Sequence, residues 1–392
     1  MNILVLGAKG FVGKNLVSAL ENIKENKDRR YSQIVIDEIL TYDIDSDEKE
    51  LFSYCEKADF IFNFAGVNRP KTADEFMKGN CDFLGRVLEI LKENGNSCPI
   101  VLSSSIQACL EGRYSGSEYG LSKKAGEELV IKYGKETGSK VMIYRFPNIF
   151  GKWARPNYNS AVATFCYNIG RDLPITVNDE KTELELLYID DLIEEMLFCL
   201  MGKEHRENSD SPYCKAQPTH RVTLGEIVNL LKQFKSFPET HMMCEIPKNS
   251  FASKLYSTYL SYLPENKAIH GFNTKSDSRG SFTELIKSEK SGQMSVNISL
   301  PGETKGEHWH HSKWEIFIVV NGEARIDMRK IDSDEVISYT VSGDDIKAVY
   351  MLPGYTHSIT NLSQSEKLVT LMWASEVFDE NKPDTFSEKV HK

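Results

Sequence analysis

The sequence predicts a doubly wound α/β domain with a parallel sheet, followed by an all-β barrel. Three observations lead to this prediction. The chain has 392 residues, more than a single hydrophobic core usually supports, so two domains are expected. Short apolar strands alternate with amphipathic helices in the first half, which is typical of parallel strands joined by crossover helices. From residue 293 onward, short alternating stretches are separated by glycine turns, which indicates a β-sandwich or barrel.

The strands of the α/β domain are predicted from short apolar runs. These runs are 3–6, 39–42, 60–64, 100–102 and 141–144. Helical spacing of apolar residues separates most of them, for example at Leu84, Leu88 and Leu91. The strands predicted for the second domain are 294–300, 315–320, 324–328, 336–341, 348–352 and 368–373. We place the two domains at 1–250 and 265–392, with the connection around 247–266.

The composition excludes several classes of partner and location. The net charge of −10 disfavours nucleic acid, because a polyanion would be repelled. No apolar run is long enough to span a bilayer, so no membrane partner is expected. The first strand follows Met1 without the charged leader of a signal peptide. The eight cysteines form no C-x-x-C pair, which indicates reduced thiols and a cytoplasmic protein. None lies beyond Cys244, so a metal site in the second domain must use His, Asp or Glu.

A glycine-rich turn follows the first predicted strand and opens the first predicted helix. Its residues are Gly7, Ala8, Lys9, Gly10, Phe11, Val12 and Gly13. Glycines here let the backbone turn tightly and approach a pyrophosphate, whose charge meets the free N–H groups at the helix start. Asn63, Ala65 and Gly66 end another strand, where a cofactor would cross the sheet edge. These residues predict a dinucleotide site.

The choice of dinucleotide stays open between two cofactors. Asp43, near the end of the second strand, could hydrogen-bond a ribose 2′-hydroxyl, which would favour NAD(H). Lys9 in the glycine turn could instead pair with a 2′-phosphate, which would favour NADPH. Asp43 could equally serve as the cap of a loop.

Tyr119 and Lys123 lie one helical turn apart, on one face of a predicted helix. A phenol with a pKa of about 10 is a poor acid at neutral pH, and a neighbouring ammonium would lower that pKa. The same lysine could hold a nicotinamide ribose. A serine of the 103–105 run, which ends an apolar strand, could hydrogen-bond a reacting carbonyl. Taken singly, Tyr119 could be a surface aromatic and Lys123 a solvated charge, but the ordered set of motifs favours catalysis.

These motifs, in this order, resemble the extended short-chain dehydrogenase/reductase family. Residues 145–151 resemble that family's Arg-x-x-Asn-x-x-Gly segment, and 188–191 its late aspartate-containing strand. The resemblance covers roughly residues 1–245. It implies that Tyr119 is the general acid, Lys123 its electrostatic partner and Ser105 the hydroxyl that orients the carbonyl. The neighbouring Ser104 ends the same strand and remains an alternative to Ser105.

A second cluster of chemistry-bearing residues lies in the β domain. Side chains alternate along a strand, so His308 and His310 are expected on one face and His311 on the other. Glu315 is expected on the following strand and His357 on a later one. Three neutral imidazoles and a carboxylate suit Zn²⁺, Mn²⁺, iron or Ni²⁺ better than calcium.

This spacing resembles the first motif of the cupin family, with Gly302 and Gly322 at its flanking glycines. Residues 353–361 resemble the second motif but are one residue tighter. The resemblance implies a cupin barrel that holds a divalent transition metal, with Zn²⁺ as the first choice. The implied ligands are His308, His310, Glu315 and His357. Residues 277–282 are similar to a segment of cupin-type deoxysugar epimerases, which remove a proton beside a 4-keto group.

The whole chain resembles bacterial capsular polysaccharide enzymes that join a short-chain reductase to an epimerase-like cupin. The stretches that carry this likeness are 65–70, 156–160, 256–263 and 306–311. The resemblance implies a UDP-sugar substrate: the cupin epimerises C-3 of UDP-2-acetamido-2,6-dideoxy-L-arabino-4-hexulose, and the reductase then delivers hydride from NADPH to C-4. The product would be UDP-2-acetamido-2,6-dideoxy-L-talose, a precursor of UDP-N-acetyl-L-fucosamine. A homo-oligomer, most simply a dimer, is expected by family analogy.

Three other functions stay open. The chain could be a nucleotide-sugar 4-epimerase or dehydratase that keeps NAD tightly bound and carries a non-catalytic cupin; net NAD(P)H consumption separates the two. It could be a redox-sensing regulator, although sensing needs no acid such as Tyr119. The cupin could also bind sugar or stabilise an oligomer around a structural metal.

Overall fold

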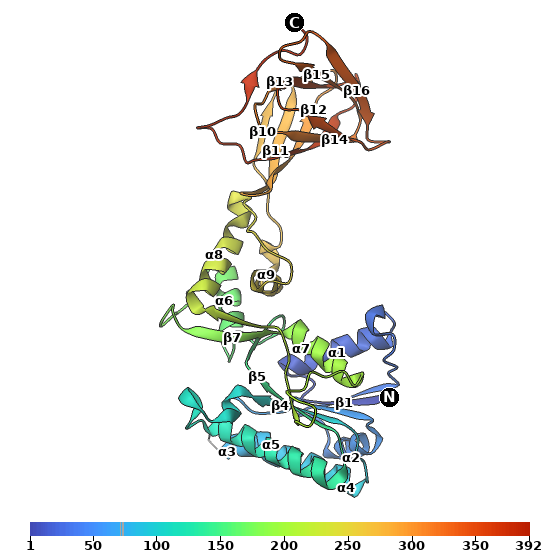
Figure 1. Cartoon of the computed structure of the whole chain (residues 1–392), viewed down its shortest axis with the longest axis vertical. Coiled ribbons are helices and arrows are strands. Elements are labelled where there is room, and N and C mark those ends of the chain that lie inside the picture. Colours follow the sequence, from blue (N-terminus) through green and yellow to red (C-terminus); the bar gives the residue numbers. More distant parts are fainter. Residues whose placement is uncertain (71, 73) are drawn as a thin grey trace. The chain divides into compact units, whose positions relative to one another are not determined.

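A computed structural model describes residues 1–70, 72 and 74–392 of the chain. It divides into two compact units, drawn in Figure 1. Unit 1 comprises Met1–Leu231 and Lys248–Pro264, and unit 2 comprises Lys232–Pro247 and Glu265–Lys392. In the described residues every helix is too short or too polar to span a bilayer.

Unit 1 is built on a parallel sheet, which confirms the predicted doubly wound, Rossmann-type architecture. Its strands, in spatial order, are β2 (Glu38–Tyr42), β1 (Asn2–Leu6), β3 (Phe60–Asn63), β4 (Ile100–Ser105), β5 (Val141–Phe146) and β8 (Tyr213–Cys214). All five pairings between neighbours are parallel. The order of strands reverses between β1 and β3, and ligands of such sheets bind beyond the carboxyl ends of the strands at that point.

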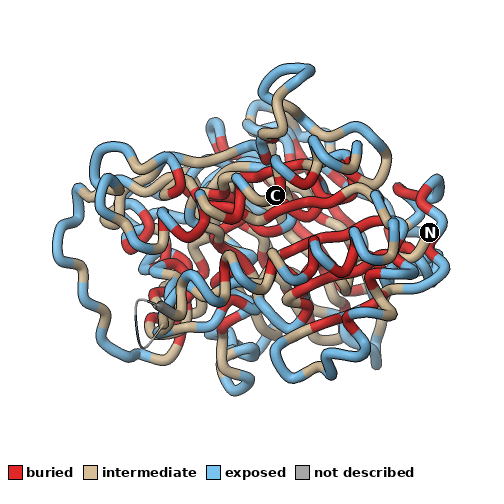
Figure 2. The backbone as a smooth tube through the Cα atoms, turned by 90° about the horizontal axis from the view of Figure 1, so that it is seen from below, coloured by how far each residue is buried: buried red, intermediate tan, exposed pale blue. Residues whose placement is uncertain are grey.

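Helices cover both faces of this sheet (Figure 1). On one face lie α1 (Phe11–Lys24) and α7 (Ile189–Leu200), and on the other lie α2 (Glu48–Lys57), α4 (Phe83–Glu93) and α5 (Glu118–Thr137). Because side chains alternate along a strand, Ile3 and Val5 pack into the first layer, whereas Leu4 and Leu6 pack into the second. Figure 2 shows the buried residues concentrated along the strands and the helix faces that cover them.

The remaining elements of unit 1 form a smaller region beside the main sheet. A three-stranded sheet contains β6 (Asn148–Phe150), β7 (Glu183–Tyr188) and β9 (Thr219–Thr223). Its helices are α6 (Ala161–Gly170), α9 (Phe251–Ser261) and the start of α8 (Leu224–Thr240), whose residues after Leu231 belong to unit 2. The short helix α3 (Asp74–Met77) instead contacts α5.

Helix α9 lies in the 247–266 segment, which was predicted as a connection. Ser250 caps the helix by accepting from Ser253 N, and Leu255 and Tyr259 are buried. The helix packs against α6, so most of this segment belongs to the body of unit 1. The sequence prediction missed the helix because Pro264 and the polar surroundings looked like a linker.

Unit 2 is mostly antiparallel sheet. The first sheet has the order β10 (Thr274–Asp277), β11 (Gly280–Ser288), β12 (Gly292–Ser299), β19 (Leu368–Ala374), β14 (Glu315–Asn321) and β17 (Ala348–Met351). The second has the order β16 (Val336–Ser342), β15 (Glu323–Lys330), β18 (Tyr355–Asn361), β13 (Thr304–Trp309) and β20 (Phe386–Ser387). Apolar residues of both sheets, such as Phe317 and Ile326, share one core.

The prediction of a second domain built of β-strands is confirmed, but its list of alternating stretches lacked β10, β11, β13, β18 and β20. The histidines of β13 and β18 were nevertheless expected to lie on strands. Strand β10 is exposed along its whole length, so no apolar alternation marks it. Strand β18 is buried but polar, with Thr356, His357 and Ser358 all fully or nearly fully buried. Hydrophobic periodicity cannot find such a strand.

Candidate functional sites

The glycine turn follows β1 and leads directly into α1 at Phe11. Gly7 has a φ of +78°, and a Cβ atom there would lie 2.7 Å from the backbone nitrogen of Ala65. A Cβ atom on Gly13 would lie 2.1 Å from the carbonyl oxygen of Gly7. Only glycine fits these two positions, so the backbone of the turn remains open to a diphosphate.

Residues beside the turn hold its shape. The backbone N–H of Lys9 donates to Asp43 Oδ2 at 2.7 Å, and the ammonium of Lys9 pairs with Asp45. Asn63 is buried and its Oδ1 accepts from the N–H of Ala65 at 3.2 Å. Asp43 therefore already supports the turn, which fits the alternative hypothesis that Asp43 caps a loop.

A cavity of about 950 Å³ lies over the turn. Of the predicted reductase residues, those that line it are Gly7, Lys9, Gly10, Phe11, Val12, Gly13, Gly66, Ser105, Tyr119 and Lys123. Asp43, Asn63 and Ala65 are not among the residues that line this cavity. The structure thus brings the proposed acid and the glycine turn into one space, and the narrow glycine cradle fits a dinucleotide.

Tyr119 and Lys123 lie in the first turns of α5, which Ser117 caps by accepting from Gly120 N. The Lys123 ammonium lies 5.8 Å from the centre of the Tyr119 ring and donates to the carbonyl oxygen of Ser103 at 3.0 Å. Burial lowers the pKa of Lys123 to about 8, although Glu127 partly opposes this. Burial raises the pKa of Tyr119 to about 12, and its hydrogen bond with Ser105 offsets only part of that rise. The lowering of the phenol pKa expected from Lys123 is therefore not seen in this structure, where burial raises that pKa.

The two candidate serines of β4 have different surroundings. The Ser104 hydroxyl donates to Glu127, whose carboxylate also binds Arg145 at 2.6 Å and the Tyr213 hydroxyl at 3.0 Å. Ser105 instead lines the cavity beside Tyr119. The buried Glu127 network had no recognisable signal in the sequence, and it leaves Ser105 as the hydroxyl available to a ligand.

In unit 2 the four predicted metal ligands meet. One ligand atom from each of the four lies within 4.8 Å of the others, and the residues are His308, His310, Glu315 and His357. His308 of β13 lies directly opposite His357 of β18 in the strand register. Glu315 is the first residue of β14, and its carboxylate lies 3.5 Å from Nε2 of both His310 and His357. His310 lies one residue beyond the end of β13, but its side chain reaches the same cluster as that of His308, as expected.

Several ring nitrogens of this cluster have no hydrogen bond within the described residues, although the Glu315 carboxylate lies 3.5 Å from two of them. His310 Nε2 and both ring nitrogens of His357 are buried without a hydrogen bond in the described part of the chain. Burial, helped by the neighbouring His357 and His310, lowers the pKa of His308 to about 4. Burial would raise the pKa of Glu315, but His310, His357 and the Lys313 ammonium outweigh it and hold that pKa well below its usual range. Neutral imidazoles around a carboxylate fit a divalent transition metal such as Zn²⁺.

Asp384 organises the loop that carries His310. Its backbone carbonyl accepts from His310 Nδ1, which fixes the proton on that nitrogen and leaves Nε2 free for a ligand. Its carboxylate accepts the backbone N–H groups of His311, Ser312 and Lys313 at 2.8–2.9 Å. Nothing in the local sequence pattern pointed to Asp384. His311 is exposed and packs edge-on against Trp309 and Phe386, so it lies outside the cluster, as predicted.

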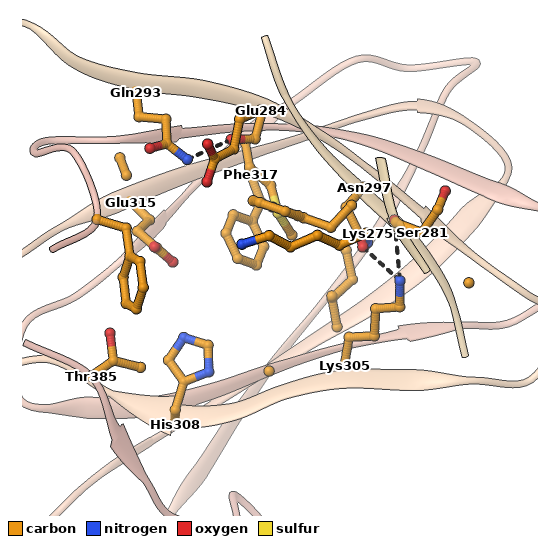
Figure 3. A pocket seen from close by; sticks show the side chains of 18 of the residues that line it. Lys275, Ser281, Glu284, Gln293, Asn297, Lys305, His308, Glu315, Phe317 and Thr385 are labelled. Atoms are coloured by element: carbon orange, nitrogen blue, oxygen red, sulfur yellow. Dashed lines mark hydrogen bonds between the residues drawn. The ribbon is translucent and has the colours of Figure 1, made fainter. Parts of the chain in front are cut away.

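A cavity of about 440 Å³ opens beside the cluster, and His308 and Glu315 line it. Figure 3 shows His308, Glu315 and Thr385 at one end of this space and Lys305 with Asn297 at the other. The Lys305 ammonium donates to Asn297 Oδ1 at 2.8 Å and to two backbone carbonyls. Burial lowers the pKa of Lys305. The polar wall can hydrogen-bond a hydroxylated ligand placed next to the metal ligands.

Two protein families match the chain, one in each unit. Residues 3–211 match a family described as the NAD dependent epimerase/dehydratase family. Residues 275–386 match a family described as the polysaccharide biosynthesis C-terminal domain.

Individual relatives extend over the whole chain. A protein of Pseudomonas aeruginosa, UDP-2-acetamido-2,6-beta-L-arabino-hexul-4-ose reductase, is 38% identical over 390 residues, covering 100% of this chain and 99% of the relative. The crystal structure of the capsular polysaccharide assembling protein CapF from Staphylococcus aureus is similar with a TM-score of 0.88 and 45% identity, covering 99% and 100% of the two chains. The crystal structure of UDP-glucuronic acid 4-epimerase from Bacillus cereus shares the fold of part of this chain, with a TM-score of 0.53 and 18% identity. The match covers 67% of this chain and 96% of that protein.

Proposed function

The chain belongs to the NAD dependent epimerase/dehydratase family, and from this premise we propose that it is a nucleotide-sugar epimerase–reductase of capsular polysaccharide biosynthesis. One observation carries the proposal: the same chain holds a tyrosine–lysine–serine set beside a glycine turn and a separate His₃Glu cluster beside a polar cavity. The first set suits carbonyl reduction, and the second suits proton transfer next to a carbonyl.

In finer detail, we assign residues 1–250 to an NADPH-dependent short-chain reductase and residues 265–392 to a metal-binding cupin. The cupin epimerises C-3 of UDP-2-acetamido-2,6-dideoxy-L-arabino-4-hexulose. The reductase then reduces C-4, which gives UDP-2-acetamido-2,6-dideoxy-L-talose. The order is chemically required, because the C-4 ketone acidifies the C-3 proton and its reduction ends that acidity.

In the reductase, Tyr119 donates a proton to the C-4 oxygen as hydride arrives at C-4, so the ketone becomes an alcohol. Ser105 hydrogen-bonds the same oxygen and orients it. Lys123 holds a ribose hydroxyl, and its positive charge favours the tyrosinate that remains. NADPH, when bound along the glycine turn, supplies the hydride.

In the cupin, His308, His310, Glu315 and His357 are the proposed ligands of Zn²⁺. When bound, the metal supplies a positive charge that stabilises an enediolate. Asp384 keeps Nε2 of His310 free for this role by accepting from Nδ1. The cavity wall near Gln293 and Asn297, both buried, holds the sugar hydroxyls.

The test is to mix the full chain with NADPH and the UDP-4-keto-6-deoxy-hexosamine and follow the absorbance of NADPH. We expect one NADPH to be oxidised for each sugar reduced. Turnover of the sugar without any net loss of NADPH would instead indicate an enzyme that keeps NAD bound and regenerates it.

A further inference from the structure

Two loops of unit 1 bring two arginines onto one tyrosine ring. The guanidinium carbon of Arg69, in the loop after β3, lies 5.5 Å from the centre of the Tyr158 ring. The guanidinium carbon of Arg155, in the loop after β6, lies 5.0 Å from the same centre. These loops contain the 65–70 and 156–160 stretches, of which only Ala65 and Gly66 have so far been given a role in the dinucleotide site.

The two positive charges are not neutralised by protein carboxylates. Both arginines are exposed, and in the described part of the chain neither forms an ion pair with an acidic side chain. Two other arginines on tyrosine rings have a carboxylate partner: Arg30 binds Asp28 at 2.7 Å, and Arg145 binds Glu127 at 2.6 Å. Arg113 and Arg171 each lie over a single ring, so Tyr158 differs from theirs in having two guanidinium groups. Two guanidinium groups on one ring repel each other, so the arrangement favours an anion between or beside them.

Arg155 and Tyr158 line the large cavity of about 950 Å³, together with Tyr119 and Gly10. Arg69 is not a lining residue, but its neighbour Asn68 is, and its guanidinium lies against the Tyr158 ring at the cavity wall. The glycine turn offers its backbone N–H groups to one diphosphate, that of the dinucleotide. Neither arginine belongs to that turn, so a second anion beside Tyr158 could reach both.

We propose that Arg69 and Arg155, held on the ring of Tyr158, bind the diphosphate of the nucleotide-sugar substrate. This inference rests on the proposed function, because it takes a nucleoside diphosphate sugar as the substrate of unit 1. A guanidinium group offers two parallel N–H donors to a phosphate, which a lysine ammonium does not. Stacking on the ring fixes the plane of each guanidinium and leaves its edges free to donate.

The experiment measures the affinities of UDP and NADPH for the full chain by calorimetry. The variants are Arg69→Ala and Arg155→Ala, and the matched control is Arg30→Ala, which removes an exposed arginine from another tyrosine ring, that of Tyr31. We expect the Kd of UDP to rise about ten- to hundredfold in the two cavity variants, as for the loss of a charged hydrogen bond. The Kd of NADPH is expected to stay within about twofold in all variants, which also shows that they are folded.

A third variant, Tyr158→Leu, keeps both charges but removes the ring. We expect a smaller rise in the Kd of UDP, because the guanidinium groups remain but lose their fixed orientation. UDP affinity like that of the wild type in Arg69→Ala and Arg155→Ala would overturn the inference. So would an equal loss of UDP and NADPH affinity, because the arginines would then not distinguish substrate from cofactor. If the wild type binds NADPH but no UDP, the proposed nucleotide-sugar function itself fails.

Discussion

At the scale of single residues, Tyr119 carries the proposed reduction. Tyr119→Phe keeps the ring but removes the proton donor. We expect kcat for NADPH oxidation to fall about 10²- to 10⁴-fold, in the range of a lost general acid. Exchange of the substrate C-3 hydrogen with solvent deuterium should persist, because the groups assigned to that step lie in unit 2. Absorbance and NMR of the same sample measure both, and unchanged NADPH oxidation would refute the role of Tyr119.

Lys123 is a functional group whose burial costs stability. Burial lowers its pKa from 10.5 to about 8, which corresponds to a cost of about 3 kcal/mol at neutral pH. Lys123→Met should abolish reduction but raise the free energy of unfolding at pH 7 by about 2 kcal/mol, since the hydrogen bond to Ser103 is also lost.

This gain in stability depends on pH. Between pH 8 and 10.5 the unfolded wild type keeps the Lys123 proton while the folded wild type has lost it. Wild-type stability therefore rises with pH in this window, and the advantage of the Met variant shrinks. Urea unfolding of both proteins from pH 7 to 10 measures the difference. A difference that grows with pH would contradict the buried-ammonium explanation.

The histidine pair His310 and His311 offers a matched test of the metal site. His310 is buried with a free Nε2, whereas its neighbour His311 is exposed. We expect His310→Ala to bind Zn²⁺ at least about tenfold more weakly, because one ligand is lost. His311→Ala should bind Zn²⁺ with the same affinity as the wild type. Metal analysis after dialysis against a competing chelator gives the comparison, and equal retention by both variants would remove His310 from the ligand set.

At the scale of elements, a bulge in β13 places His308 opposite His357. The register shifts between Gly306 and His308, and Glu307 at the bulge has a φ of +61°. Gly306 itself has a φ of +95°, and a Cβ atom there would lie 2.7 Å from the carbonyl oxygen of His357. The bulge thus changes the direction of the side chains that follow it on β13, next to the proposed metal ligands.

Gly306→Ala should therefore disturb both strands of the site. We expect the free energy of unfolding to fall by at least about 2 kcal/mol and the Zn²⁺ affinity to fall with it. The control is Gly302→Ala, which also has a positive φ, of +74°, but whose nearest neighbour is the flexible Gln364 at 4.0 Å. That variant should lose about 1 kcal/mol and keep its metal affinity. Equal metal affinity in the two variants would show that the bulge does not position the ligands.

The elements that the sequence predicted well are those with an apolar pattern. Strands β1 to β5 have buried residues in every position or in alternation, and the glycine turn stands where β1 meets α1. Strand β18, whose interior is polar, was indicated only by its histidine, because its burial depends on hydrogen bonds that form only in the folded chain. The link of Asp384 to the His310 loop spans a long stretch of sequence, so no local pattern could show it.

At the scale of the whole molecule, the two units carry two separate sites. The four residues that meet in the cluster were all expected together from their spacing and its resemblance to the cupin motif, because metal ligation constrains which residue types can stand at such positions. The pKa of Tyr119 was not predicted correctly, because it depends on how deeply the ring is buried in the folded chain. The partners of Ser104 were missed for the same reason, since Glu127 and Arg145 meet only after α5 packs on β4.

One measurement tests most directly whether the two sites act in sequence on one substrate. The full chain, loaded with Zn²⁺, is incubated in D₂O with NADPH and the UDP-4-keto sugar of arabino configuration, and the product is examined by NMR. We predict a talo-configured product with deuterium at C-3 and an unlabelled hydrogen, from NADPH, at C-4. A reduced product that keeps its original C-3 hydrogen and configuration would contradict the coupling of an epimerase to the reductase.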